Sequence, residues 1–81
     1  KDKNPYTAFA RAAAAINEET ATPFIEVLLA DKDFAVRLGG IAWAERNESR
    51  ALEPNLRSMA AGDESEAVRR RAAQALLRIA P

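Results

Sequence analysis

The residues that could carry chemistry in this 81-residue chain are carboxylates, hydroxyls and arginines, because the sequence contains neither histidine nor cysteine. That composition excludes thiol catalysis, disulfides, histidine-based triads and zinc sites of the Cys/His type. Glu18 and Glu19 fall in a polar link, and Glu64 and Glu66 fall at a predicted helix start, where acids complement the helix dipole. No serine has a histidine to activate it, and no Gly-x-x-x-x-Gly-Lys pattern could cradle a phosphate. We therefore expect no enzyme activity, no catalytic residue, no metal site and no cofactor.

Arginines are concentrated near the C-terminus, where Arg69, Arg70, Arg71 and Arg78 accompany one glutamate between residues 66 and 81. Three readings are open: a solvated helix face balanced by nearby acids, a surface for an anionic partner, and a nucleic-acid surface. The whole chain has 12 basic and 12 acidic residues and a net charge of zero. Proteins that bind nucleic acid or a membrane surface usually have a basic footprint, so nucleic acid is the least favoured reading.

The composition indicates that helices must position these side chains. Hydrophobic residues make up 48% of the chain, and alanine, leucine, arginine and glutamate, all strong helix formers, dominate it. Capping residues and apolar spacing predict five helices, at about residues 5–17, 23–30, 34–46, 49–61 and 65–80, with Thr22 capping the second. Residues 18–20 form a predicted link, Pro54 should loosen or kink the first turn of the fourth helix, and Gly62 should end that helix in the left-handed conformation.

No stretch reaches the roughly 18–20 uncharged apolar residues that a membrane-spanning helix needs. Without cysteines or a visible targeting segment, a cytoplasmic location is the default expectation. The chain starts at Lys1 without an initiating methionine, so we interpret it as a processed piece or a fragment of a longer protein.

The chain also repeats itself at an offset of 32 residues. The segment 31–37 (DKDFAVR) falls on 63–69 (DESEAVR) with four of seven residues identical. Upstream, the apolar residues Phe24, Val27 and Leu28 fall on Leu56, Met59 and Ala60, whereas Pro23 and Pro54 differ by 31, which indicates a one-residue slip. The segment 11–16 more loosely matches 71–76. These matches divide the chain into a half repeat, 1–20, and two repeats, 21–48 and 49–81.

Each unit consists of an apolar helix, an Asp-x-x-x-x-Val-Arg turn and an alanine-rich helix, and it resembles the HEAT-like repeat family in its short, phycobilisome-lyase-type form. The resemblance implies an all-α fold: one domain over residues 1–81, an α-solenoid of about two and a half helical-hairpin repeats with five antiparallel helices. The tetratricopeptide and ankyrin signatures, which have similar periods, are absent.

The repeated turns supply a structural motif. Each aspartate precedes a helix, where its carboxylate can meet free N–H groups. The two valines should face the core. By resemblance, the two arginines reach the aspartate of an adjacent unit. The motif residues are Asp31, Val36, Arg37, Asp63, Val68 and Arg69.

Two features of the third helix have alternative explanations. Gly39 and Gly40 each cost about 1 kcal/mol relative to alanine inside a helix. Close helix packing is the favoured reason, and a partner or ligand backbone approaching the helix is the alternative. Trp43, the sole tryptophan, is expected in the core, although tryptophan also anchors interfaces.

The resemblance favours a non-catalytic scaffold that binds a protein on the concave face of the first, third and fifth helices. Its candidate contacts are Arg37, Leu38, Ile41, Arg70, Arg71 and Gln74. The alternatives are an accessory or regulatory module of an enzyme, including a chromophore-lyase-like one, and, more weakly, nucleic-acid binding. Neither end of the chain looks capped, so we also expect either a longer array or self-association through an end helix.

Overall fold

The computed structural model describes residues 18–81, and within that range the fold is all-helical, without strands. The helices are α2 (Glu18–Leu29), α3 (Phe34–Arg46), the short 3-10 helix η1 (Arg50–Leu52), α4 (Glu53–Gly62) and α5 (Glu66–Ile79). The predicted all-α class is confirmed for this range. The helix predicted over residues 5–17 lies outside the described residues.

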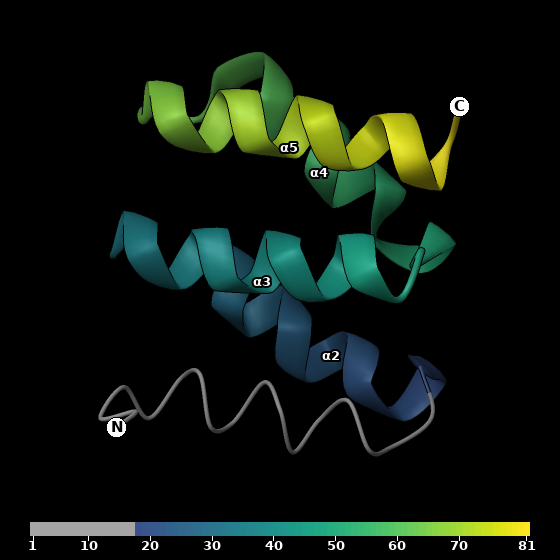
Figure 1. The fold of residues 1–81 in the computed structure, drawn as a ribbon. Coiled ribbons are helices and arrows are strands. Elements are labelled where there is room, and N and C mark those ends of the chain that lie inside the picture. Colours follow the sequence, from purple (N-terminus) through teal and green to yellow (C-terminus); the bar gives the residue numbers. More distant parts are fainter. Residues whose placement is uncertain (1–17) are drawn as a thin grey trace, which may run out of the picture.

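The helices form two hairpins that lie side by side. α2 packs against α3, α4 packs against α5, and α3 packs against α5. In Figure 1, α3 and α5 run next to each other in the same direction, and α2 and α4 lie behind them. The links between the hairpin helices, residues 30–33 and 63–65, are too short to let the paired helices separate. The molecule therefore has a front layer, α3 and α5, and a rear layer, α2 and α4.

The ends of α3 and α5 agree with the prediction because local side chains fix them. The Asp33 carboxylate accepts a hydrogen bond from the Ala35 N–H at 2.9 Å, and α3 ends at Arg46, with Asn47 as its C-cap. The Ser65 hydroxyl accepts one from the Val68 N–H at 3.3 Å at the start of α5. Each cap satisfies a backbone donor that the helix leaves unpaired.

The rear layer differs from the prediction at its first helix. Residues 18–20 belong to α2 and are not a link, and Pro23 lies inside this helix. Pro23 is exposed, so its ring meets solvent, and the buried Ala21 two residues earlier extends the packed face of α2 beyond the proline. The prediction that Thr22 caps the start of this helix was therefore wrong.

The fourth predicted helix is two elements, η1 and α4, and Pro54 lies in the first turn of α4, where a missing N–H does no harm. Gly62 is the last residue of α4 and has a negative φ, so the left-handed C-terminus predicted there is wrong. The left-handed residue is instead Glu48, with φ 48°, shortly after the end of α3. It turns the chain from the first hairpin into the second.

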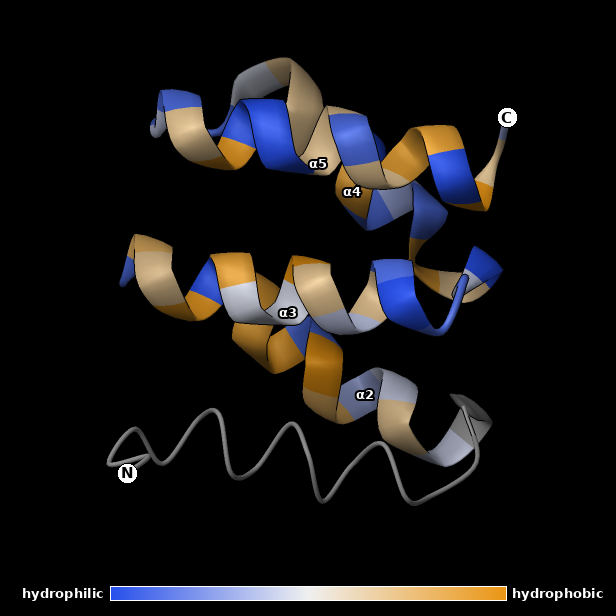
Figure 2. Cartoon of the chain, in the orientation of Figure 1, coloured by the Kyte–Doolittle hydropathy of each residue, from blue (hydrophilic) through white to orange (hydrophobic). Residues whose placement is uncertain are grey.

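The core lies between the two layers, and Figure 2 shows the hydrophobic residues of α2 gathered where it crosses α3. Trp43 is a core residue, with 5% of its surface exposed, as predicted. The fully buried residues include one isoleucine from each helix of the first hairpin and a leucine or valine from each helix of the second. The largest of them are Ile25, Ile41, Leu52, Leu56 and Val68.

Burial also settles how the rear helices correspond. Phe24 is 44% exposed and Val27 66% exposed, whereas Leu56 is fully buried, so the alignment of Phe24 and Val27 with Leu56 and Met59 was wrong. Ile25, fully buried, is the counterpart of Leu56 at an offset of 31. The offset of 31 that Pro23 and Pro54 show therefore holds along both rear helices. One additional residue near Gly62 in the second unit returns the offset to 32 at the following turn.

Close packing explains one of the two adjacent glycines. A Cβ on Gly40 would lie 2.9 Å from the Leu29 Cδ2 atom and 3.2 Å from the Leu28 Cβ atom. Among residues 18–81, nothing lies within 4 Å of where a Cβ on Gly39 would be, and this residue is exposed. The favoured explanation is therefore correct for Gly40 and wrong for Gly39.

Candidate interaction face

The two repeated turns have the same hydrogen-bond pattern. The Asp31 Oδ1 atom accepts from the Asp33 N–H at 2.8 Å, and the Asp63 Oδ1 atom accepts from the Ser65 N–H at 2.8 Å. Six residues after each aspartate, an arginine Nη1 atom donates to that aspartate's carbonyl oxygen, at 2.8 Å for Arg37 and 2.5 Å for Arg69. The repetition seen in the sequence is therefore also a repetition of contacts.

Arg37 also joins the two hairpins. Its Nη2 atom donates to the Asp63 Oδ1 atom at 3.0 Å, and its Nε atom lies 2.9 Å from the Asp63 Oδ2 atom. Both side chains are 8% exposed. A forked contact between a guanidinium and a carboxylate fixes both distance and angle. Arg37 thus makes the contact to the neighbouring aspartate that the resemblance implied.

This arrangement corrects part of the expected partner surface. Arg37 is buried against Asp63 and Ile41 is fully buried, so the prediction that they face a partner is wrong. Helical geometry explains the error: both residues are buried and lie one turn apart on α3, which packs against α2 and α5. Leu38 is half-buried against the core, and the three candidates on α5 remain accessible.

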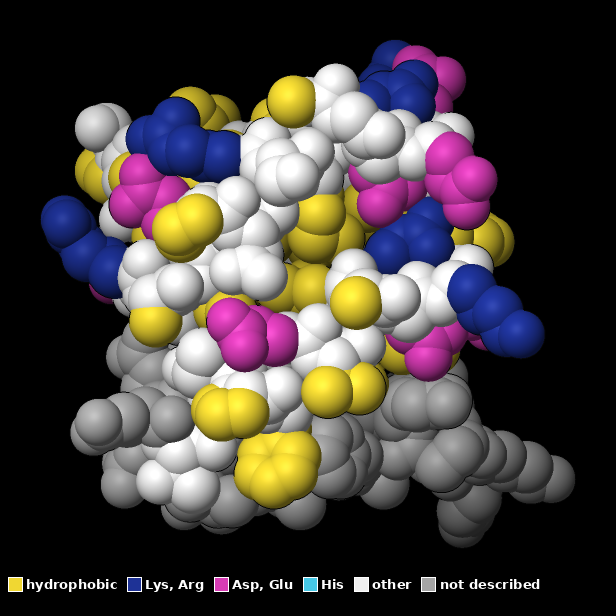
Figure 3. Space-filling model, turned by 180° about the vertical axis from the view of Figure 1, so that it is seen from behind, with side chains coloured by type: hydrophobic (Ala, Val, Ile, Leu, Met, Phe, Trp, Pro, Cys, Tyr) yellow, Lys and Arg dark blue, Asp and Glu magenta, His cyan; other side chains and the backbone are white. Residues whose placement is uncertain are grey.

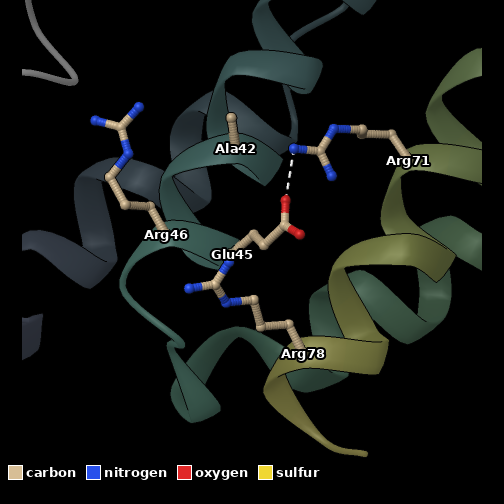
Figure 4. Close-up of a pocket in the computed structure, with 5 residues that line it drawn as sticks. All are labelled: Ala42, Glu45, Arg46, Arg71 and Arg78. Atoms are coloured by element: carbon tan, nitrogen blue, oxygen red, sulfur yellow. Dashed lines mark ion pairs between the residues drawn. The ribbon is translucent and has the colours of Figure 1, made fainter.

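The accessible surface of the front layer is defined by the residues opposite the buried faces of α3 and α5, and we name it the α3–α5 face. Its members are exposed or half-buried: Ala35, Leu38, Ala42, Glu45, Arg46, Ala67, Arg70, Arg71, Gln74, Leu77 and Arg78. A shallow open pocket of about 250 Å³ lies on this face, lined by Ala42, Glu45, Arg46, Arg71 and Arg78. In Figure 4, Glu45 lies between the arginines of α5 and Arg46 points away from them.

Ion pairs between the hairpins organise this pocket. The Arg71 Nη2 atom lies 2.5 Å from the Glu45 Oε1 atom, and the Arg78 Nε atom lies 3.5 Å from the Glu48 Oε2 atom. Arg71 and Glu45 are 33% and 19% exposed, whereas Arg78 and Glu48 are both more than half exposed. The first pair is therefore the better shielded from solvent and salt.

Most of the C-terminal arginines have acidic partners. Besides the two pairs with α3 and its following turn, Arg70 lies 3.2 Å from Glu66 one turn earlier on α5. Arg46 has no ion pair within residues 18–81. Of the three interpretations of these arginines, the solvated helix face balanced by nearby acids thus describes the structure best. The sequence did not identify Glu45, Glu48 or Arg46 as residues of this face. For Arg46, its correspondence with Arg78 at an offset of 32 was the available signal.

The rear surface has a different character. Figure 3 shows acidic and basic side chains interspersed with single hydrophobic ones over α2 and α4. A second shallow pocket, of about 170 Å³, lies between these helices and is lined by Glu26, Leu29, Ala30, Asn55, Ser58 and Met59. None of these described lining residues is basic, so none of them opposes the charge of the Glu26 carboxylate.

Nothing in the described range assembles a metal centre or a membrane span. Within residues 18–81, no three acidic side chains are grouped closely enough to hold a metal ion. No helix of this range combines the length and the apolar character that crossing a bilayer requires. Comparisons of the chain with known protein families, with curated proteins and with solved structures found no match.

Proposed function

We propose that this chain is a short α-solenoid of HEAT-like repeats that works as a non-catalytic protein-binding scaffold. The support for the solenoid is the recurrence of contacts. The turns 31–37 and 63–69 share their hydrogen bonds, and Arg37 connects one turn to the next. Stacked units that contact only their neighbours are the organisation of a solenoid. Two and a half repeats and five helices follow if residues 5–17 form the first helix.

The α3–α5 face is the proposed binding surface, and one observation carries this choice. Positions 32 residues apart on the two helices are accessible on the same face: Ala42 corresponds to Gln74, and Arg46 corresponds to Arg78, both exposed arginines. Small residues on α3 let a partner approach, and Arg70, Arg78 and Gln74 on α5 offer donors that a protein's carboxylates and carbonyls can accept.

A protein partner suits this face better than a nucleic acid does. Arg70, Arg71 and Arg78 each have a glutamate partner, so the local positive charge that phosphates require is largely balanced. The balanced charge instead suits a partner with both acidic and apolar groups, for which Leu77, 73% exposed, supplies an apolar contact. An accessory role beside an enzyme would use the same surface.

Capture from an extract of the source cells tests the proposal. The chain would be immobilised, treated with nuclease and washed with about 0.3 M salt, at which unspecific charge contacts are screened. We expect a specific protein to be retained and to be lost with the Arg46→Glu and Arg78→Glu double variant. Arg57→Glu, a charge reversal on the rear helix α4, is the matched control and should retain it.

The opposite pattern would contradict the proposal. If Arg57→Glu and the face variant lose the captured protein equally, the α3–α5 face is not the binding surface. If the only retained material is nucleic acid that leaves in moderate salt, the scaffold role is wrong. Circular dichroism of each variant ensures that a loss of binding is not a loss of fold.

A further inference from the structure

The pocket on the α3–α5 face has more basic than acidic side chains in its lining. Three arginines line it, Arg46, Arg71 and Arg78, together with the single acid Glu45. Its residues come from α3 and α5, which pack against each other, so the pocket lies inside the front layer and not on an outer flank. A ligand that fits this pocket should therefore carry negative charge.

The three arginines differ in how firmly acids hold them. Arg71 is paired with Glu45 at 2.5 Å in a contact that is largely shielded from solvent. Arg78 lies 3.5 Å from Glu48, and both side chains are more than half exposed, so this pair contributes little to stability. The Arg46 side chain is exposed and has no ion pair within residues 18–81. The guanidinium groups of Arg46 and Arg78 are therefore available to a ligand at small cost.

The spacing of these two arginines follows from the repeat. Arg46 and Arg78 are 32 residues apart, and each lies in the last turn of its helix. Because α3 and α5 run side by side in the same direction (Figure 1), the two Cα atoms are separated by about the distance between packed helices, 8–10 Å. In Figure 4 the Arg46 side chain points away from Arg78. The two guanidinium groups are thus placed for two separate acceptors and not for one shared acceptor.

We propose that this pocket binds an extended acidic segment of a partner protein through two carboxylates three residues apart, one for Arg46 and one for Arg78. The proposal rests on the proposed function, because it names the part of the partner that the α3–α5 face binds. An extended chain advances about 3.1–3.3 Å per residue, so three residues span about 9–10 Å, which matches the helix spacing. In the polyproline II conformation, side chains three residues apart also point to the same side. The carboxylate that binds Arg78 replaces that of Glu48.

The rest of the pocket suits a protein carboxylate better than a phosphate. A phosphate group carries about two negative charges and would lie in the same pocket as the Glu45 carboxylate, whereas a carboxylate carries one. The short side chain of Ala42 lets the backbone of the segment lie close to α3. Next to Arg78, Leu77 is 73% exposed and offers an apolar contact to the residues between the two acids.

An NMR titration of the whole 81-residue chain, labelled with ¹⁵N, tests the proposal at about 50 mM salt. The probe is a capped polyproline peptide with two glutamates three residues apart. The Nε–Hε signals of Arg46 and Arg78 should shift, whereas that of Arg57 on the rear helix should not. A peptide of the same composition with adjacent glutamates should bind about threefold or more weakly, because only one of its carboxylates reaches an arginine.

Variants of the two arginines and of the competing acid sharpen the test. Arg46→Gln and Arg78→Gln should each weaken binding of the spaced peptide by about threefold or more, and Arg57→Gln should leave it unchanged. Glu48→Gln should strengthen binding by about twofold, because it removes the carboxylate that the peptide displaces from Arg78. The same spectra show whether each variant is folded.

Four results would overturn the proposal. They are arginine signals that do not move with about 5 mM peptide, equal binding of the two peptides, an equal loss with Arg57→Gln, and inorganic phosphate that shifts the signals at a lower concentration than the peptide does. The scaffold role is tested separately by capture. A captured protein that needs Arg46 and Arg78, together with a peptide that does not bind, would leave the scaffold role standing and exclude the acidic segment.

Discussion

Arg37 and Arg69 occupy equivalent places in the two hairpins, and they differ in what lies beyond them. Each donates to the carbonyl oxygen of its own turn's aspartate, but only Arg37 meets the carboxylate of a following unit, Asp63. The same turn sequence therefore produces a buried arginine with an ion pair to the next unit and a half-buried arginine without an ion pair among the described residues. The local sequence thus fixes the position of the arginine within its own turn. The neighbouring unit determines what the arginine contributes to stability.

The two hairpins also differ in the sizes of the side chains at the contact between their helices, and the change on one helix compensates the change on the other. Leu29 on α2 reaches Gly40 on α3, where a Cβ would lie within 2.9 Å of it. At the corresponding contact of the second hairpin, α4 has Ala60 and α5 has Ala72, which is fully buried. A large residue opposite glycine in one unit is replaced by two alanines in the other, so both helix pairs pack closely.

Truncating Arg37 should lower the free energy of unfolding by several kcal/mol more than truncating Arg69. Arg37→Ala leaves the Asp63 carboxylate buried without its cation and should lower the free energy of unfolding by about 3–5 kcal/mol. Arg69→Ala removes no ion pair of the described residues and should cost less than about 1 kcal/mol. Urea unfolding followed by the fluorescence of the buried Trp43 measures both. Equal losses for the two variants would mean that the hairpins do not differ in this way.

Truncations in the rear layer test how its helices correspond, with slightly smaller losses. Ile25→Ala and Leu56→Ala should each cost about 2–5 kcal/mol, because both side chains are fully buried at equivalent positions of α2 and α4. Val27→Ala, at a residue 66% exposed, should change the free energy of unfolding by less than about 0.5 kcal/mol. Chemical denaturation of the three variants measures these losses. A large loss at Val27 with a small one at Ile25 would restore the offset of 32 for these helices.

A more moderate loss is expected at the compensated contact. Gly40→Ala should cost about 1–3 kcal/mol, because the added Cβ forces Leu29 to move. In a Leu29→Ala background, which imitates the second hairpin, the same change should cost nothing or stabilise the chain by up to about 1 kcal/mol. Thermal unfolding of the parent chain, the two single variants and the double variant gives the coupling energy between Gly40→Ala and Leu29→Ala. An equal cost of Gly40→Ala in both backgrounds would show that Leu29 is not the obstacle.

The neighbouring glycine should respond with a small gain. Gly39→Ala should raise the free energy of unfolding by about 0.5–1 kcal/mol, since alanine favours the helix and no described residue lies within 4 Å of the new Cβ. The same unfolding curves measure it. A loss of stability would indicate that residues outside the described range occupy this space.

The parts of the fold that could be predicted from the sequence are those that local chemistry determines. Asp33, Asn47 and Ser65 mark the helix ends that the structure has, because a cap acts on backbone groups a few residues away. The helix over 18–20 was missed, since Pro23 was taken as a start although the helix continues around it. Local propensity does not say how far packing extends a helix.

The candidate site could be predicted only in part, for a related reason. Arg37 and Ile41 were expected at an open surface, but both are buried, because α3 packs against α2 and α5. The sequence of α3 alone does not show which of its sides these neighbours cover. The pairs of Glu45 with Arg71 and Glu48 with Arg78 join residues of different hairpins, so no spacing rule within one helix finds them. The repeat itself was the signal that placed these helices side by side.

A double-mutant cycle between Arg37 and Asp63 determines whether this pair joins the two units. Arg37→Met keeps the length of the side chain, and Asp63→Asn keeps the oxygen that accepts from the Ser65 N–H. Urea unfolding of the parent, both single variants and the double variant gives the coupling energy. We predict a favourable coupling of about 2 kcal/mol or more between the two residues. Losses that add to within about 0.5 kcal/mol would show instead that the two units are not joined through this pair.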